Sequence, residues 1–324
     1  MISSDFHSNP FEHVALGKLF DAIGADRILW TPQAEKDGLC RLKRLESMSE
    51  GLLPNKAITT VLPIKKLLLP PREEIWNFRC GWFHPAQEPE AFAVIGIPLC
   101  DLQAVWYLDQ VFADDLLYRA RREQAFLVGM VCEPNPECRC DQQLMPLAGD
   151  LFIGEDRVWA LSTAGVTLLR TCSRHAPQEL PLPWPAGAAE KRDTLTQELY
   201  SSTRDAAVWE EEAKRCLSCG ACSSVCPTCY CFDMMDEAAL DGSVIRSRVW
   251  DNCFFAEHGK VAGGYDFRPG RANRLRFRME HKKFGFGSLR GQDSCVGCGR
   301  CRKACPVDID LDVIAERLNA EATQ

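Results

Sequence analysis

Two short cysteine runs have the spacing that most clearly predicts chemistry in this 324-residue chain. Both follow the pattern C-x2-C-x2-C-x3-C-P, in which three thiolates can wrap around one compact [4Fe–4S] cube while the fourth reaches elsewhere. The spacing therefore predicts two cubane clusters. The first run contains Cys216, Cys219, Cys222 and Cys226, and the second contains Cys295, Cys298, Cys301 and Cys305.

The fourth cysteine of each run is expected to bind the cluster of the other run, as it does in ferredoxins with two clusters. Glycines beside the ligands leave backbone amides free to point at sulfur, where hydrogen bonds offset the negative charge of a cluster. The prediction assigns Cys216, Cys219, Cys222 and Cys305 to one cluster, and Cys295, Cys298, Cys301 and Cys226 to the other.

Two alternative uses of these cysteines fit the spacing less well. Zinc sites take four ligands in two pairs and do not need evenly spaced quartets. The spacing Cys222-x3-Cys226-x2-Cys229 matches that of radical S-adenosylmethionine enzymes, but it leaves Cys216 and Cys219 without a role. The second run also has no counterpart of Cys229.

The composition describes a globular chain with 46% apolar residues. Its net charge of −7 argues against nucleic-acid binding by the whole chain, because such binding depends on clustered Lys and Arg. No basic segment followed by an apolar one begins the chain, and the apolar stretches Ala91–Leu99 and Ala125–Val131 are too short to span a bilayer. We therefore expect a cytoplasmic protein that binds no membrane, whose eighteen cysteines serve ligation more than disulfide formation.

Elements in α/β order precede the cysteine runs. Ala91–Ile97 and 125–131 are continuous apolar runs typical of buried strands. Between them, apolar residues recur at helical spacing over 102–111, and 114–124 predicts a polar helix. The segment Leu151–Leu169, interrupted by glycines, predicts short strands joined by turns.

A proline-rich stretch, Pro177–Pro185, predicts a linker between two domains. After it, Ala188–Arg215 predicts helix that leads into the first cysteine run. The expected fold is α+β. An N-terminal α/β domain over residues 1–186 is followed by a mostly helical, ferredoxin-like two-cluster domain over residues 187–324.

A long insertion separates Cys226 from Cys295, and its second half is strongly basic. A local nucleic-acid patch is one interpretation. Positive charge beside anionic clusters, with a charged rim that steers a partner protein, is the favoured one. The basic residues are Arg268, Arg271, Arg274, Arg276, Arg278, Lys282, Lys283 and Arg290.

Further motifs lie around the runs, namely Arg248-x-Trp250-Asp251-x-Cys253, Ala262–Gly264, Phe267-Arg268, His281-Lys282, Cys226–Cys231 and Cys295–Cys301. Together they resemble the iron–sulfur subunits of anaerobic sulfite reductase and of soluble NAD(P)-linked nickel–iron hydrogenases (the sulfhydrogenase beta subunit). The resemblance implies an electron relay with a flavin-containing NAD(P)H oxidoreductase subunit on one side and a terminal catalytic subunit on the other. That terminal subunit would be a nickel–iron hydrogenase or a siroheme sulfite reductase. The end of the second motif, residues 305–311, favours hydrogenase.

Four earlier cysteines also match positions of this family and could hold a third [4Fe–4S] cluster. Cys100 and Cys132 each follow a predicted buried strand, at the end where α/β sheets place their ligand crevices. Cys138 and Cys140 come shortly after Cys132. The competing interpretation is that these four are buried, inert thiols.

No residue pattern predicts an active site. The chain has no G-x-G-x-x-G after a strand, no H-E-x-x-H and no Ser/His/Asp arrangement. Three functional classes compete: an electron-transfer subunit without catalysis of its own, a self-contained iron–sulfur reductase, and an iron–sulfur protein that binds nucleic acid. The cysteine runs favour the electron-transfer subunit.

Overall fold

The computed structural model describes residues 9–12, 16–45, 56–133, 136–140, 145–155, 157–172, 195–285 and 287–322. The chain divides into two compact units, and neither is continuous in sequence. The first unit comprises Met1–Leu68, Gln87–Pro136 and Gln142–Ala188, and the second comprises Leu69–Ala86, Glu137–Asp141 and Ala189–Gln324. The predicted boundary between residues 186 and 187, with its proline-rich linker, lies outside the described residues.

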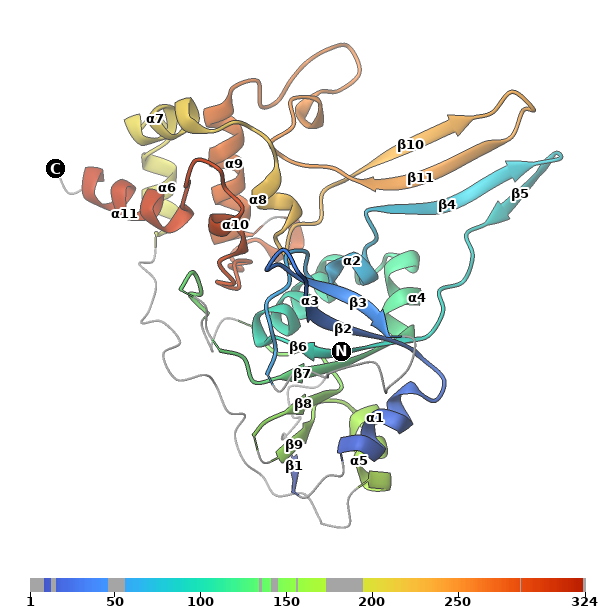
Figure 1. Cartoon of the computed structure of the whole chain (residues 1–324). Coiled ribbons are helices and arrows are strands. Elements are labelled where there is room, and N and C mark those ends of the chain that lie inside the picture. The colour runs from blue at the N-terminus through green and yellow to red at the C-terminus, as the bar shows by residue number, and fades with distance from the viewer. Residues whose placement is uncertain are drawn as a thin grey trace. The chain divides into compact units, whose positions relative to one another are not determined.

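The described part of the first unit contains a seven-stranded sheet (Figure 1). Its strands are β1 (Asn9–Glu12), β2 (Ile28–Ala34), β3 (Cys40–Leu45), β6 (Phe92–Ile97), β7 (Ala125–Met130), β8 (Leu151–Ile153) and β9 (Arg157–Ala160). They lie in the order β1-β9-β8-β7-β6-β2-β3. The four strands β2, β6, β7 and β8 are parallel neighbours, and the others pair antiparallel toward the edges.

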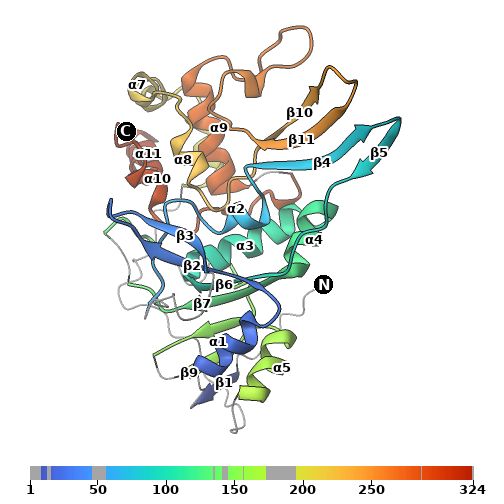
Figure 2. The same cartoon turned by 45° about the vertical axis from the view of Figure 1, so that its right-hand side comes forward.

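One face of this sheet packs against α1 (Leu16–Gly24) and α5 (Thr163–Cys172), which lie side by side in Figure 1 and Figure 2. Their apolar residues form one buried cluster with Ile95 and Val128 of the central strands. The expectation of strands throughout 151–169 is therefore wrong beyond β9. Helix forms there because the apolar residues recur at helical spacing and reach the sheet.

The opposite face of the sheet is covered by helix α3 (Leu99–Val111), whose Leu102 lies against Gly129 of β7. Both faces of β6 and β7 are thus buried, which explains their continuous apolar sequences. The helices predicted at 102–111 and 114–124 are confirmed. These two helices are α3 and α4 (Leu116–Gln124), and the first unit also contains the short helix α2 (Lys65–Leu68).

The second unit has a helical core. Its helices are α6 (Gln197–Ser202), α7 (Ala207–Arg215), α8 (Ala221–Ser224), α9 (Arg271–Phe284), α10 (Arg300–Lys303) and α11 (Leu311–Ala322), with 3₁₀ turns η1 (Glu257–Gly259) and η2 (Gly287–Leu289). The ring of Tyr200 packs 6.2 Å from that of Trp209 and 5.1 Å from that of Phe284. The helix expected over 188–215 is two helices where described, α6 and α7, and the Trp209 indole donates to the Thr203 carbonyl at the bend between them. Among the described helices, none is both long and apolar enough to cross a membrane.

The second unit also contains a four-stranded antiparallel sheet, which the expectation of a mostly helical domain omitted. Its strands are β4 (Arg72–Arg79), β5 (Trp82–Pro85), β10 (Phe232–Ala238) and β11 (Val244–Trp250), in the order β10-β11-β4-β5. Figure 2 shows them as two hairpins side by side. A buried ion pair, Arg248 Nε to Glu73 at 3.1 Å, joins β11 to β4. The Trp250 indole donates to the Leu69 carbonyl at 2.9 Å, so 69–86 belongs to this unit despite its distance in sequence.

Candidate iron–sulfur site

The two cysteine runs adopt the same local fold. In each, a glycine with a left-handed backbone, Gly220 at φ 73° or Gly299 at φ 72°, precedes a single helical turn, α8 or α10. Glycine enters this backbone region at little cost, whereas other residues are strained there. The duplication in the sequence is therefore repeated in the backbone, where each glycine lies between the second and third cysteines and the third cysteine lies in the helical turn.

A pocket in the second unit gathers cysteines from both runs. It is lined by Cys216, Cys219, Cys222, Cys301 and Cys305, by apolar residues that include Phe254, Leu275 and Ile309, and by Arg278. The four cysteines assigned to the first cluster are all among these residues. Four thiolates in a mainly apolar cage form a donor set that fits a cubane cluster, because cubane iron takes thiolate ligands.

Two of the four cysteines assigned to the second cluster line another pocket of the same unit. Cys295 and Cys301 line that pocket together with Lys282, whereas Cys298 and Cys226 are buried. Burial, followed by the charges of Cys295 and Cys226, raises the pKa of the Cys301 thiol to about 12. Cys226 and Cys222 of the first run both contribute to this shift, so the two runs lie close together.

The surroundings of Cys226 favour its thiolate form. A hydrogen bond from Cys229 holds its pKa well below the usual range, and the nearby cations Lys282 and Arg278 act in the same direction. The same hydrogen bond raises the pKa of Cys229, which therefore remains a thiol. Thiolate is the form of cysteine that binds metal, so Cys226 is suited to ligation and Cys229 to support it.

Two further thiols lie beside the first run. Cys231 donates a hydrogen bond to Cys253, which lowers the pKa of Cys253 to about 6. Both belong to the same apolar core as Cys216 and Cys222. Their position agrees with the expectation that these extra family cysteines pack near the cluster ligands.

The basic residues of α9 differ in their surroundings. Arg278 and Lys282 are buried, at 3% and 4% exposure, and both side chains bond to the segment that follows Cys222. Arg271 of α9 is exposed, as is Arg290 beyond the end of the helix. Positive charge beside the cluster ligands is therefore present as expected, while the charged docking rim stays a prediction.

Asn252 holds the first cysteine loop, and sequence analysis did not single it out. Its Nδ2 donates to the Gly220 carbonyl at 2.7 Å, and its side chain is buried. A Cβ on Gly220 would lie 2.4 Å from this nitrogen and 2.8 Å from the ring of Phe255. The only sequence signal was its place inside the Arg248–Cys253 family motif.

We expect Gly220→Ala to lower both the stability and the iron content of the protein. A side chain on left-handed backbone costs about 1–2 kcal/mol, and the alanine methyl group would also displace Asn252. Gly242→Ala is the matched control, because Gly242 has φ 80° but open space around its Cα. Thermal midpoint and iron per chain, measured anaerobically, should both fall for Gly220→Ala and only the midpoint for Gly242→Ala. Full iron retention in Gly220→Ala would contradict this account of the loop.

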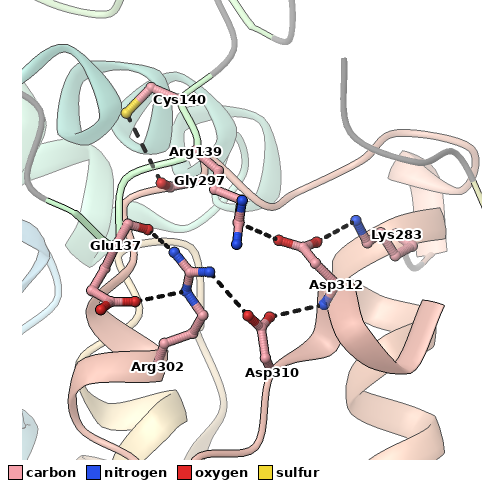
Figure 3. Close-up of polar contacts among 8 residues, drawn as sticks. All are labelled: Glu137, Arg139, Cys140, Lys283, Gly297, Arg302, Asp310 and Asp312. Atoms are coloured by element: carbon pink, nitrogen blue, oxygen red, sulfur yellow. Dashed lines mark hydrogen bonds and ion pairs between the residues drawn. The ribbon is translucent and has the colours of Figure 1, made fainter. Parts of the chain in front are cut away.

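Residues 137–140 pack against the loop of the second run (Figure 3). The Arg139 amide donates to the Gly297 carbonyl at 2.7 Å, and Cys140 Sγ lies 4.0 Å from the same oxygen. A Cβ on Gly299 would lie 2.4 Å from the Glu137 carbonyl oxygen. This close backbone approach explains why Glu137–Asp141 belongs to the second unit.

Ion pairs around Arg302 reinforce that contact (Figure 3). The pairs are Arg302 with Asp310 at 2.9 Å, Arg302 with Glu137 at 3.3 Å, Arg139 with Asp312 at 3.6 Å and Lys283 with Asp312 at 3.1 Å. Arg302 lies between the third and fourth cysteines of the second run. The network therefore ties the segment that contains Cys138 and Cys140 directly to a cluster loop.

The four cysteines of the predicted third cluster lie in different units. Cys100 is buried in the first turn of α3, just after β6, and Cys132 follows the neighbouring parallel strand β7. Their predicted place at the ends of two buried strands of the first unit is confirmed. Cys138 and Cys140 belong to the second unit.

Comparison with known proteins identifies the C-terminal half as a cluster domain. A family model described as a 4Fe-4S dicluster domain matches residues 215–309, and a second model with the same description matches residues 170–229. The "Sulfhydrogenase 2 subunit beta" of Pyrococcus furiosus is 31% identical over 293 residues, which cover 80% of this chain and 84% of that protein. The "F420-dependent formate dehydrogenase subunit beta" of Methanocaldococcus jannaschii is 29% identical over 110 residues, 34% of this chain and 21% of that protein. No solved structure matches the chain.

The predicted cofactors are confirmed by these matches: the chain carries two [4Fe–4S] clusters. The cysteine-lined pocket in the second unit fits that cofactor in its donor atoms. The assignment of each cysteine to one cluster or the other, and the third cluster, stay predictions.

Proposed function

Because this chain belongs to the family of the sulfhydrogenase 2 beta subunit, we propose that it is the electron-transfer subunit of an oxidoreductase complex. It relays electrons with a flavin-containing NAD(P)H oxidoreductase subunit on one side and a terminal catalytic subunit on the other. The clusters supply one-electron transfer, and this chain supplies no catalytic site of its own. The relatives named as subunits of a sulfhydrogenase and of a formate dehydrogenase support a role inside a complex.

The observation that carries this proposal is the pocket shared by the two runs. Cys216, Cys219 and Cys222 line it together with Cys305, which comes from the other run. The proposed crossed ligation would tie the two ligand loops together and keep their clusters near each other. Closely spaced clusters suit electron relay, because electron tunnelling falls off steeply with distance.

A third cluster at Cys100, Cys132, Cys138 and Cys140 would extend the relay. The contact of residues 137–140 with Gly297 supports it, because two of the four proposed ligands lie beside the loop of the second run. Electrons could then pass from the third cluster to the cluster of that loop. One partner subunit would dock near the third cluster and the other near the two-cluster unit.

A nickel–iron hydrogenase of the sulfhydrogenase type is the terminal subunit we favour, because the matched relative is named for that activity and covers most of both chains. A siroheme sulfite reductase served by the same relay is the alternative. We further propose a cytoplasmic location, with no nucleic acid or membrane as partner, from the acidic net charge and the short apolar segments of the sequence.

The relay predicts that the isolated chain does not react with NADH or NADPH. Its clusters should stay oxidised in an anaerobic titration with either nucleotide, as followed by visible absorbance. They should be reduced when the flavin subunit is added, and reoxidised when the terminal subunit follows with its substrate. Reduction of the isolated chain by NAD(P)H would contradict the relay and favour a self-contained reductase.

A further inference from the structure

One of the buried cations of α9 lies beside the cysteine loops of both runs. Arg278 projects from α9 and is only 3% exposed. Its Nη1 donates to Ser223 Oγ at 2.8 Å, and its Nη2 donates to the Cys222 carbonyl at 3.0 Å. The guanidinium is therefore fixed against the backbone of the first run at one of its ligands.

The same guanidinium also lies beside cysteines near the second cluster. Arg278 Nη1 lies 3.3 Å from Cys229 Sγ, and Arg278 lines one pocket with Cys222 and Cys301. In the crossed assignment Cys301 binds the second cluster, while Cys222 binds the first. Arg278 thus bonds to the backbone of one proposed ligand and shares a pocket with a proposed ligand of the other cluster.

No carboxylate is among the contacts of Arg278 in the described part of the chain. Its partners are a hydroxyl, a carbonyl and a thiol, together with the ring of Phe254 at 5.9 Å. A buried charge is costly unless opposite charge compensates it. The thiolate ligands and the clusters that they hold are the negative charge available here.

We propose that Arg278 is a positioning residue that raises the reduction potentials of both clusters. The inference rests on the two-cluster function proposed above. Reduction adds one electron and makes a cluster more negative, so a fixed positive charge nearby stabilises the reduced form. Charge and hydrogen bonds around the sulfurs are among the factors that set cluster potentials. Because Arg278 acts on both ligand loops, it keeps both clusters reducible within one relay.

The test is a redox titration, monitored by electron paramagnetic resonance, of the full-length chain and of Arg278→Gln. Iron and sulfide per chain are measured first, so that a missing cluster is distinguished from a shifted potential. We expect Arg278→Gln to retain its iron and to lower both midpoint potentials. At a fixed potential the reduced-to-oxidised ratio should fall about tenfold, which corresponds to about 59 mV for one electron.

Two further variants separate charge from structure. Arg276→Gln removes a charge from the same helix, but Arg276 lies over the ring of Tyr200, 4.7 Å from its centroid. The cluster potentials of the Arg276→Gln variant should therefore match those of the unmodified chain. Arg278→Lys keeps the charge without the guanidinium fork, and should shift the potentials much less than Arg278→Gln does. Unchanged potentials in Arg278→Gln, or a shift in only one cluster, would overturn the proposal.

Loss of iron is also decisive. If Arg278→Gln loses iron, Arg278→Lys must retain it with potentials close to those of the unmodified chain. Iron loss in both variants would show that the guanidinium serves only to build the loops, and would overturn the proposal. None of these results bears on whether the unmodified chain holds two clusters, which its own iron and sulfide content decides.

Discussion

Cys305→Ala is expected to remove the cluster of the other cysteine run. Alanine cannot bind iron, so the variant should lose about four iron and four sulfide per chain, one cubane. The lost cluster should be the one held by Cys216, Cys219 and Cys222, because these three line one pocket with Cys305. Iron content alone does not identify which cluster is lost, so double variants are needed.

Combining Cys305→Ala with Cys219→Ala should cost no more iron than either change alone, because both remove the same cluster. Combining Cys305→Ala with Cys298→Ala should cost about eight iron, because two clusters are lost. Ligation within each run predicts the opposite pattern. Cys172→Ala, in α5 and outside every predicted ligand set, is the control that should keep all of its iron.

Cys138→Ala is expected to block electron transfer between the partner subunits. If Cys100, Cys132, Cys138 and Cys140 hold a third cluster, the variant should lose about four iron while keeping the two clusters of the cysteine runs. The flavin subunit, like the terminal subunit, should keep full activity with artificial dyes. Only the transfer that passes through this chain should fail, because one step of the relay becomes too long.

The outcome that would rule out the third cluster is equally concrete. If Cys138→Ala retains all its iron and full transfer between the partner subunits, the four cysteines are structural. The contact between residues 137–140 and the Gly297 carbonyl would then serve only to hold the second loop. Cys172→Ala is again the control for the loss of a thiol.

Local spacing made the cluster loops predictable from the sequence. Each quartet needs only a short segment, and the glycines at 220 and 299 mark the turn that the backbone must make. The strands β6 and β7 were predictable for a similar reason, since strands buried on both faces have continuous apolar sequences.

Contacts between distant segments were not predictable. The ion pair of Glu73 with Arg248 brings β4 and β5 into the second unit, and although Arg248 belongs to a family motif, nothing in the sequence marks Glu73 as its partner. The same holds for Arg278, one of eight basic residues over 268–290, because periodicity does not reveal which of them is buried against cysteine loops. Asn252 likewise gains its role only when its amide reaches the Gly220 carbonyl.

The central claim, that the twin runs hold two cubane clusters, is tested most directly by analysis of iron and sulfide in the full-length chain purified without oxygen. Mössbauer spectroscopy of the same sample should show the iron in [4Fe–4S] clusters. We predict at least about eight iron and eight sulfide per chain from the two runs, with about four more of each if the third cluster is present. A chain that binds only zinc, or only one cluster, under these conditions would contradict the account.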